Sequence, residues 1–326
     1  MALGLMFPLA PDPVLLAIAV CADFAFGDPV YSLHPVRLIG RSLSGIESFL
    51  RRIRLDGYGG GIVLFISLAT IWVGGVSGAL LWIVRVNALL AAALHLFLAY
   101  SLLAMGDLLH HGREVEAALC RADLPAARLA ISKLVGRDTD RMDAAACRRA
   151  SLESLSESLT DGFMSALFWY ALVGLPGLVL FKVVSTMDSM VGYKTPRYLR
   201  FGWCGARLDD LMNFVPARLT WLLIVLVAAV LPRSSAKKAL RIGWSQHALC
   251  PGPNSGWSEA ALAGAIERRL AGPIWLRGNL VTDIWLGEPR DPPASEHSDY
   301  SHGVTVVVVT GILSAVLACI FIWARS

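Results

Sequence analysis

Long apolar stretches alternate with polar segments along most of the chain. A helix needs about 20 predominantly apolar residues to cross the hydrocarbon layer of a membrane. Five stretches have about that length, namely residues 61–84, 86–105, 163–184, 214–231 and 304–324. This pattern predicts an all-α, polytopic integral membrane protein with about five transmembrane helices, in a range of roughly four to six, and a helical layer on the membrane surface.

One of these stretches and one shorter apolar stretch are less regular. Residues 163–184 are interrupted at Gly174, Pro176 and Gly177, so they could form two half-helices that re-enter the membrane. Residues 13–26 are short and contain Asp23, which makes them a marginal span. The number of spans is therefore left open at this point.

The polar segments contain helical patterns of their own. Apolar positions at helical spacing, with a turn at "GRDTD", predict a helical membrane-surface insertion over residues 106–160. A turn at "GPNSG" leads into a helix over about residues 257–271. The Pro-rich, acidic stretch 285–303 predicts a flexible loop before the last transmembrane helix. We expect a single membrane domain over residues 1–326.

Composition supports the membrane class. Hydrophobic residues make up 56% of the chain and charged residues only 17%, whereas a soluble domain is about a quarter charged. The formal net charge of +4 is small and dispersed, which argues against nucleic-acid binding. The six cysteines show no metal-binding spacing, and the histidines have no ligand partners at useful spacing, so we expect neither a disulfide framework nor a Cys/His metal motif.

One short polar stretch lies directly before an apolar one. In "SLESLSESLTDGF", Glu153, Glu157 and Asp161 follow each other at a spacing of four, which places three carboxylates on one face of a helix and three leucines on the other. The ordinary interpretation is an amphipathic helix whose acids face water. The functional interpretation is a carboxylate row that binds a divalent metal or a cationic substrate group.

Three other stretches are unusually polar for their surroundings. Residues 23–41 contain two aspartates and a His-Pro pair at the edge of an apolar segment, where charged groups usually face a cavity or a partner. Residues 185–220 combine acids with basic residues that could hold phosphates or contact lipid headgroups. Residues 252–266 form a turn before a helix, which attracts anions or is simply a capped helix start.

These stretches together resemble one protein family. They are "GDPVYSLHPVRLIGR", "VGRDTDRMD", "SLESLSESLTDGF", "MDSMVGYKTPRYLRFGWCGARLDDLMNFVPARLT" and "GPNSGWSEAALAGA". In this order they are similar to the CobD/CbiB family of cobalamin biosynthesis, the adenosylcobinamide-phosphate synthases. The similarity extends from about residue 20 to about residue 290, and "MDSMVGYK" followed by "ARLDDLMN" is its most specific part.

The resemblance implies an enzyme of the cell (inner) membrane with several spans. It implies ATP-dependent amide formation between the ring-D propionate of adenosylcobyric acid and (R)-1-aminopropan-2-ol or its phosphate. ATP and Mg²⁺ are the implied cofactors, and the corrinoid is a substrate. The implied partners are these substrates, the lipid bilayer and other membrane enzymes of the cobalamin pathway, with no nucleic acid.

The resemblance also implies which residues form the site. His34 is the expected proton carrier, and the expected catalytic and Mg²⁺-binding acids are Glu153, Glu157, Asp161 and Asp188. The expected substrate- and phosphate-binding residues are Asp28, Arg37, Lys194, Arg197, Asp209, Asp210, Asn213, Arg218, Asn254, Ser255 and Glu259. The chain departs from the residues usual in the family at Ser158, Ala166, Ser185, Cys250 and Ser258.

Two other interpretations remain at this point. One is a non-catalytic membrane relative of the AmpE type that binds a ligand and signals. The other is a transporter, which the broken apolar stretch 163–184 and the intramembrane aspartates would suit. A synthase predicts that the polar stretches gather at one site, whereas a transporter predicts acids along a path and repeated halves, and the sequence shows no internal repeat.

Overall fold

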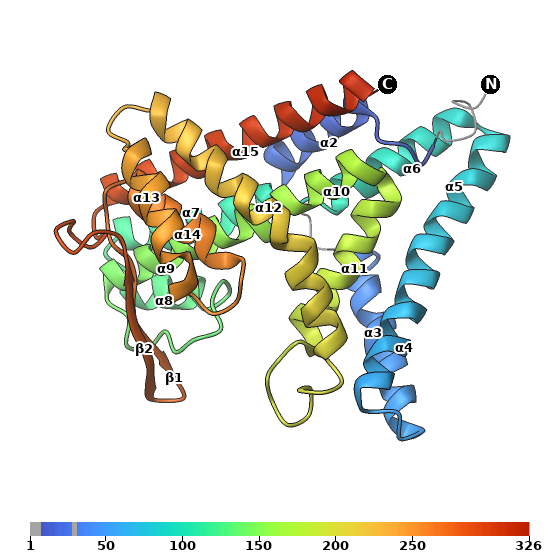
Figure 1. Cartoon of the computed structure of the whole chain (residues 1–326), viewed down its shortest axis with the longest axis horizontal. Helices are drawn as coiled ribbons and strands as arrows, with labels where there is room; N and C mark the ends of the chain where they lie inside the picture. Colours follow the sequence, from blue (N-terminus) through green and yellow to red (C-terminus); the bar gives the residue numbers. More distant parts are fainter. Residues whose placement is uncertain (1–7, 28–30, 326) are drawn as a thin grey trace. The chain divides into compact units, whose positions relative to one another are not determined.

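A computed structural model describes residues 8–27 and 31–325, and almost every element in it is a helix (Figure 1). Contacts within the chain divide it into two compact units. Unit 1 holds residues 8–27, 31–104, 165–213 and 315–325, and unit 2 holds residues 105–164 and 214–314. The sequence predicts one domain with an insertion at 106–160. The difference arises because the helices of that segment pack against later helices and form a core with them.

Unit 1 is built from helices whose ends match local sequence signals. They are α2 (Pro13–Phe26), α3 (Pro35–Arg52), α4 (Tyr58–Ala69), the π-helical turn η1 (Thr70–Gly74), α5 (Gly75–Val86), α6 (Ala88–Ser101), α10 (Ser165–Val173), α11 (Leu175–Val191) and the first part of α12 (Trp203–Val230). Asp12 caps α2 by accepting hydrogen bonds from two backbone N–H groups, and Asn87 caps α6 in the same way. Leu64, Val183 and Phe201 are fully buried in the core between α3, α4 and α11.

The break predicted within residues 163–184 is confirmed. Helix α10 ends at Val173 and α11 begins at Leu175, with Gly174 between them at a φ of +77°. A Cβ atom at Gly174 would lie 2.1 Å from the carbonyl oxygen of Leu9, so both the backbone angle and the space require glycine.

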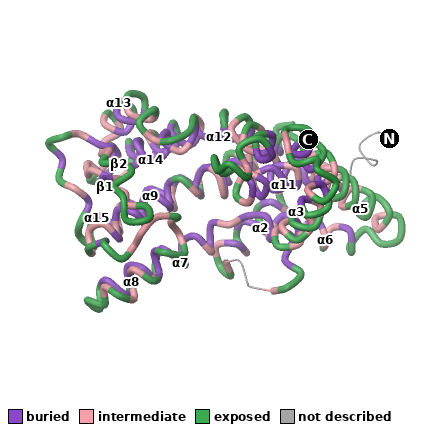
Figure 2. The backbone as a smooth tube through the Cα atoms, turned by 90° about the horizontal axis from the view of Figure 1, so that it is seen from below, coloured by how far each residue is buried: buried purple, intermediate pink, exposed green. Residues whose placement is uncertain are grey.

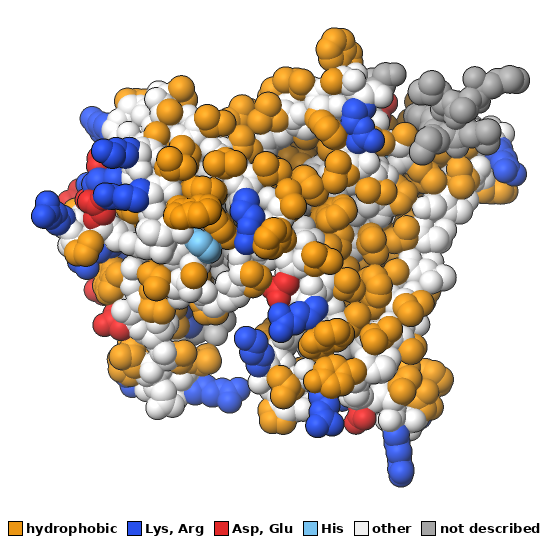
Figure 3. Space-filling view, in the orientation of Figure 1, with side chains coloured by type: hydrophobic (Ala, Val, Ile, Leu, Met, Phe, Trp, Pro, Cys, Tyr) orange, Lys and Arg blue, Asp and Glu red, His pale blue; other side chains and the backbone are white. Residues whose placement is uncertain are grey.

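The apolar stretches form helices long enough to cross a membrane. Within residues 8–27 and 31–325 four such stretches occur, namely Tyr58–Val86, Ala88–Cys120, Trp203–Val230 and His297–Arg325. Helix α2 is apolar but shorter, at 14 residues, and α10 and α11 have 9 and 17 residues. Figure 2 shows α5 largely exposed although it is apolar, and hydrophobic side chains cover much of the face in Figure 3. Exposed apolar helices of this kind face lipid, and the chain is a multi-pass membrane protein.

Unit 2 combines helices with one small sheet. Its elements are α7 (Met105–Cys120), α8 (Leu124–Ile131), α9 (Ala144–Ser158), the π-helical turn η2 (Leu159–Met164), the rest of α12, α13 (Ala236–Gln246), the 3₁₀ turn η3 (His247–Leu249), α14 (Ser255–Ala265), β1 (Leu270–Leu276), β2 (Asn279–Leu286) and most of α15 (His297–Arg325). Helix α14 packs against α13 and α9, and the three leucines of "SLESLSESLTDGF" are fully buried.

The hairpin corrects the prediction of a helix over 257–271. Helix α14 stops at Ala265, and β1 then pairs antiparallel with β2. Gly272, at a φ of +100°, and Pro273 both oppose a helix there. The strands are joined by Arg277 and Gly278, both at positive φ, as a two-residue turn of the primed type requires. Arginine is an unusual residue for this turn, so no local pattern indicated a hairpin.

The segment before α15 is shorter than the loop predicted over 285–303. Strand β2 runs to Leu286 and α15 begins at His297. The connection between them is held to the rest of unit 2, since Lys238 Nζ lies 2.8 Å from Asp291 Oδ1 and Arg269 Nε donates to the Asp291 carbonyl at 3.0 Å. Ala294 is fully buried.

Candidate active site

A cavity of about 330 Å³ in unit 2 gathers four of the predicted site residues. Glu153 and Glu157 come from α9, and Ser255 and Glu259 come from α14. Each pair is four residues apart, so each pair occupies one face of its helix, and the packing of α9 against α14 makes the two faces meet. The β1–β2 hairpin, the turn before α14 and the loop after α8 supply the remaining walls.

Glu153 is the most firmly held of the three glutamates. Arg137 Nη2 donates to Glu153 Oε2 at 2.7 Å, and the backbone N–H of Ala271 in β1 donates to Glu153 Oε1 at 3.0 Å. Glu153 is only 8% exposed, so its charge depends on these two donors. The ion pair therefore ties α9 to the loop after α8, and the second hydrogen bond ties α9 to the hairpin.

Fewer described hydrogen-bond donors offset the negative charges of Glu157 and Glu259 than offset the charge of Glu153. Glu157 opens onto the cavity, and enclosure by the cavity walls, together with the negative charge of Glu153, raises its pKa above the ordinary range. Burial raises the pKa of Glu259 further, and Glu157 and Glu153 add to this effect. Arg137 is the one Lys or Arg among the described residues that line the cavity. Three carboxylates with one guanidinium attract a cation and favour a bound proton.

Cys250 completes the acidic wall. Its Sγ donates to Glu259 Oε2 at 3.6 Å. Burial raises the pKa of the thiol, and the charge of Glu259 raises it further, so the thiol stays protonated and acts as a donor. Cys250 stands where the family resemblance predicts histidine, and it is too weak a hydrogen-bond donor to neutralise Glu259 as an imidazolium would.

A second polar cluster lies in unit 1, where α11 and α12 pack together. Asn213 Nδ2 donates to Asp209 Oδ2 at 2.9 Å, and Ser165 Oγ donates to Asn213 Oδ1. Asp188 on α11 interacts electrostatically with Asp209 and Asp210 on α12. Four of the predicted residues are thus brought together here, namely Asp188, Asp209, Asp210 and Asn213.

Two predicted phosphate-binding residues, Lys194 and Arg197, lie in the exposed connection between α11 and α12. Arg197 Nη2 lies 3.4 Å from Glu47 Oε1, and the same carboxylate accepts a hydrogen bond from Arg51 Nε at 2.8 Å. Arg197 therefore shares its anionic partner with Arg51. These contacts all lie within unit 1.

The other predicted residues of the early chain are also in unit 1. His34 is buried at the start of α3, with its ring edge-on to Tyr31 at 5.2 Å between centroids. Arg37 is exposed on α3. Asp28 lies outside the described residues.

Arg218 and Asn254 lie in unit 2, at the start of α14. Arg218 Nη1 donates to Asn254 Oδ1 at 3.1 Å, and its guanidinium stacks over Phe214 at 3.5 Å and over Trp257 at 4.9 Å. Arg218 is thus held at the amino end of the helix whose first turn carries Ser255 to the cavity.

Comparison with known proteins decides the family. A family model described as CobD/Cbib protein matches residues 16–321. The chain belongs to the CobD/CbiB family. It is 40% identical over 282 residues to a cobalamin biosynthesis protein CobD of Pelobacter propionicus, covering 86% of this chain and 87% of that protein. It is 38% identical over 277 residues to a cobalamin biosynthesis protein CbiB of Salmonella typhimurium, covering 84% and 86%.

A third relative, a cobalamin biosynthesis protein CobD of a Sinorhizobium species, is 37% identical over 317 residues, which is 94% of this chain and 97% of that protein. No solved structure matches the chain. The resemblance noted in the sequence is therefore confirmed, and it extends over almost the whole chain.

In this CobD/CbiB protein the four acids predicted to bind Mg²⁺ are divided between the two units. Glu153 and Glu157 line the cavity, but Asp188 belongs to unit 1, and Asp161 lies in η2 and is not among the lining residues. The π-helical turn η2 explains why Asp161 does not line the cavity. A π-helix has more residues per turn than an α-helix, so a spacing of four no longer keeps Asp161 on the helix face of Glu153 and Glu157. Glu259, predicted to bind substrate, stands among the acids instead.

The cavity nevertheless fits a magnesium ion. Mg²⁺ is usually bound through one or two carboxylates, with waters and phosphate oxygens as its other ligands. Glu157 is exposed to the cavity, and the carboxylate of Glu153 retains acceptor capacity beyond its two hydrogen bonds. The role of these residues as metal ligands stays a prediction.

Two residues that shape the cavity were not predicted from the sequence. Arg137 lies in "GRDTD", which reads as a turn, and only the fold shows that this turn meets Glu153. Ala271 lies in the hairpin that the sequence did not predict. The occurrence of "VGRDTDRMD" among the family-like stretches was the available signal for Arg137.

Proposed function

We propose that this chain is the adenosylcobinamide-phosphate synthase of cobalamin biosynthesis. It joins the ring-D propionate of adenosylcobyric acid to the amine of (R)-1-aminopropan-2-ol, or of its phosphate, through an amide. Membership of the CobD/CbiB family supports the pathway, since the relatives are named cobalamin biosynthesis proteins. The acidic cavity supports the reaction, and neither the signalling nor the transport alternative has an observation of this kind behind it.

The observation that carries the proposal is the meeting of Glu153, Glu157 and Glu259 in one small cavity. An alkylamine is protonated at neutral pH, so a carboxylate site attracts it electrostatically. The ammonium must lose a proton before its nitrogen can attack a carbonyl carbon. A carboxylate with a raised pKa is a better base for that proton than an ordinary one. We assign this step to the ionised form of Glu259, because burial raises its pKa well above the ordinary range and so makes that form the stronger base.

The size of the cavity fits the smaller substrate. A volume of about 330 Å³ lies at the lower end of small-molecule sites, which span roughly 300–1,000 Å³. An aminopropanol or its phosphate fits this space, whereas a corrin ring is much larger. The corrinoid therefore binds outside the cavity and extends only its propionate arm into it.

A phosphate on the amine substrate would also find partners here. Arg137 lines the cavity, and Ser255 places the first turn of α14 at its edge. Backbone N–H groups at a helix start favour anions. This arrangement binds an ammonium at the glutamates and a phosphate at the helix start, which orients the amine along the cavity.

When bound, ATP and Mg²⁺ would activate the propionate by converting its carboxylate oxygen into a leaving group. Glu157 and Glu153 are the residues we assign to Mg²⁺. The β1–β2 hairpin contributes Ile274 and Ile284 as an apolar wall, which limits the access of water to the activated carboxyl group from that side.

The experiment is a reconstitution with the full chain purified in detergent. The protein is supplied with adenosylcobyric acid, ATP, Mg²⁺ and either aminopropanol or its phosphate, and the corrinoid products are analysed by mass spectrometry. We expect an amide of one of the two amines, dependent on ATP. Folded protein that forms no corrinoid amide from either amine would contradict the proposal.

A further inference from the structure

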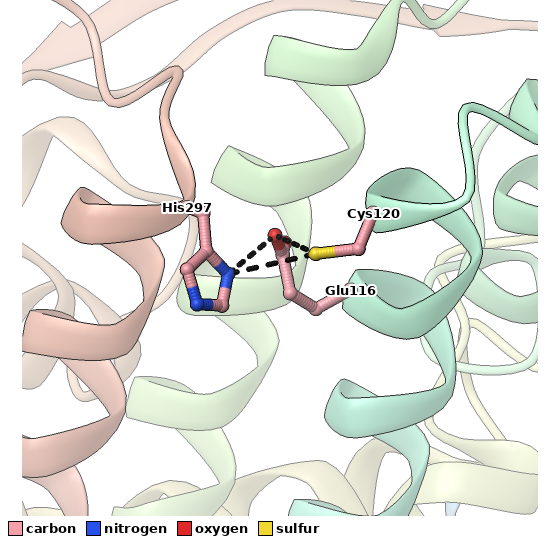
Figure 4. A group of neighbouring side chains, drawn as sticks. All are labelled: Glu116, Cys120 and His297. Carbon is pink, nitrogen blue, oxygen red and sulfur yellow. Dashed lines mark hydrogen bonds and ion pairs between the residues drawn. The ribbon is translucent and has the colours of Figure 1, made fainter.

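A second cluster of side chains in unit 2 plays no part in the proposed reaction. Glu116 and Cys120 lie one turn apart on α7, and His297 is the first residue of α15. Figure 4 shows the three side chains pointing toward one another. Among residues 8–27 and 31–325, this is the one group of at least three His, Cys, Asp or Glu residues whose ligand atoms all lie within 4.8 Å of one another.

The distances match the edges of a tetrahedral metal site. His297 Nδ1 lies 3.0 Å from Glu116 Oε1, Cys120 Sγ lies 3.5 Å from Glu116 Oε1, and Cys120 Sγ lies 3.7 Å from His297 Nδ1. Zinc binds nitrogen and oxygen at about 2.0–2.1 Å and sulfur at about 2.3 Å, so tetrahedral ligand atoms lie roughly 3.3–3.6 Å apart. Small side-chain movements would bring all three atoms to those distances.

Neighbouring residues hold two of the three side chains in place. The guanidinium of Arg148 binds both oxygens of Glu116, with Nε 2.9 Å from Oε2 and Nη2 2.9 Å from Oε1, and also donates to the Ser295 carbonyl. Ser301 Oγ lies 3.2 Å from His297 Nε2, which leaves Nδ1 directed at the cluster. Such outer contacts orient the ligands of metal sites.

The cluster also has an open side. A cavity of about 350 Å³ is lined by all three residues and by Arg113, Tyr300 and Ser301. Metal sites with three protein ligands keep a fourth position for water or a small ligand. The cavity supplies the space for that position, and the exposure of Cys120 and His297 gives an ion access.

We propose that Glu116, Cys120 and His297 bind a divalent transition-metal ion such as Zn²⁺ or Co²⁺, with its fourth position facing this cavity. Thiolate and imidazole ligands favour such ions over Mg²⁺, which prefers oxygen ligands. This site is therefore distinct from the glutamate cavity and does not depend on the proposed function. The charges of Arg148 and Arg113 oppose the metal, and the carboxylate of Glu116 and the thiolate of Cys120 offset them.

The sequence did not predict this site because its members are far apart. The cysteines show no metal-binding spacing, and His297 lies 177 residues from Cys120. Only the contact between the end of α7 and the start of α15 brings the ligands together. A bound ion would connect these two helix ends.

The test is a titration of the full chain with Co²⁺, in detergent and after treatment with a chelator. Cobalt bound to a thiolate gives a charge-transfer absorption band in the near ultraviolet, which reports the Cys120 ligand directly. We expect saturation at one Co²⁺ per chain, displacement by Zn²⁺ and no displacement by excess Mg²⁺. Binding releases the thiol proton, so the affinity for Co²⁺ rises with pH.

Variants identify the ligands. C120S should lose the thiolate band, and H297A should weaken binding by more than the roughly 10–100-fold typical of outer-contact mutations. The matched controls are C21S, which removes a different exposed cysteine, and H110A, which removes a different exposed histidine that lies on α7. Both should bind as the wild type does.

Two results would overturn the site. One is a wild-type chain that shows no thiolate band at saturating Co²⁺, and this result does not depend on any variant folding. The other is an unchanged band in C120S. No substrate is present in these titrations, so their outcome is separate from that of the amide-forming assay.

Discussion

At the scale of single residues, the Arg137–Glu153 pair has the clearest structural role. The side chains are each 11% exposed, and their charged atoms lie 2.7 Å apart. Arg137→Gln would leave a buried carboxylate with the Ala271 N–H as its remaining described donor. We expect a loss of about 3–5 kcal/mol in the free energy of unfolding, measured as a lower thermal midpoint.

The exposed pair between Lys133 and Glu114 provides the control for that measurement. Their side chains are 51% and 36% exposed, so Lys133→Gln should cost no more than about 1 kcal/mol. The double variant R137Q/E153Q should recover part of the loss, because no charge is then left without a partner. Equal stability of R137Q and K133Q would show that the buried pair has no such role.

The raised pKa of Glu259 predicts a dependence of stability on pH. Between the ordinary pKa of a glutamate and the raised value, the folded protein keeps a proton that the unfolded chain has lost. The free energy of unfolding therefore falls as pH rises through this window. Glu259→Gln cannot ionise, so the fall should be smaller in this variant, and thermal midpoints between about pH 4.5 and 8 would show it.

Glu157 should contribute a decline in the same direction, since its pKa is also raised. E157Q is therefore expected to resemble E259Q, and the variant lacking both carboxylates should show the weakest pH dependence. If E259Q and the wild type lost stability equally over this range, the carboxylate would not be protonated in the folded state.

Local spacing predicted part of the cavity. The four-residue repeat placed Glu153 and Glu157 on one helix face, and the structure puts both at the cavity. The same repeat failed at Asp161, because a change from α-helical to π-helical hydrogen bonding depends on packing that no local pattern records. Arg137 was missed because its partner is 16 residues away and its turn carries no sign of it.

At the scale of elements, the β1–β2 hairpin is a wall of the cavity that a single substitution should loosen. Its tip is held by Asp138, whose carboxylate accepts hydrogen bonds from the N–H groups of Arg277 and Gly278 at 3.0 and 2.7 Å. The Asp138 N–H donates to the Trp275 carbonyl at 2.8 Å. These contacts are confined to one end of the hairpin, so removing the carboxylate should loosen the tip without unfolding unit 2.

We therefore expect trypsin to cleave the Asp138→Ala variant faster after Arg277. We also expect a higher KM for the amine substrate, because one wall of the cavity becomes mobile. The exposed Asp140 of the same loop provides the control, and D140A should behave as the wild type does. Identical cleavage rates in D138A and D140A would mean that Asp138 does not hold the hairpin.

Long elements were predicted better than short ones. The apolar stretch 304–324 lies within α15, and the break at Gly174 follows from glycine and proline alone. The hairpin was missed because a β-strand is defined by its partner, and the Arg277–Gly278 turn is atypical. The predicted flexible loop was too long because the ion pair and hydrogen bond that hold Asp291 join residues distant in sequence.

At the scale of the whole molecule, the predicted site residues fall into two groups, one in each compact unit. The glutamate cavity belongs to unit 2, and the Asp188–Asp209–Asn213 cluster belongs to unit 1. Composition and apolar length sufficed to predict a multi-pass membrane protein. The division into units was not predictable, because it depends on which helices pack together across more than 100 residues of sequence.

We propose that the glutamates of the unit 2 cavity carry out amide formation. The most direct measurement is the rate of corrinoid amide production by purified wild type, E157Q, E259Q and the surface control E114Q under the same conditions. With these roles, E259Q should slow the reaction by about 10²–10⁴-fold, as expected for loss of a general base, E157Q should also fall well below the wild type, and E114Q should keep its rate. Wild-type rates in both E157Q and E259Q would contradict this proposal.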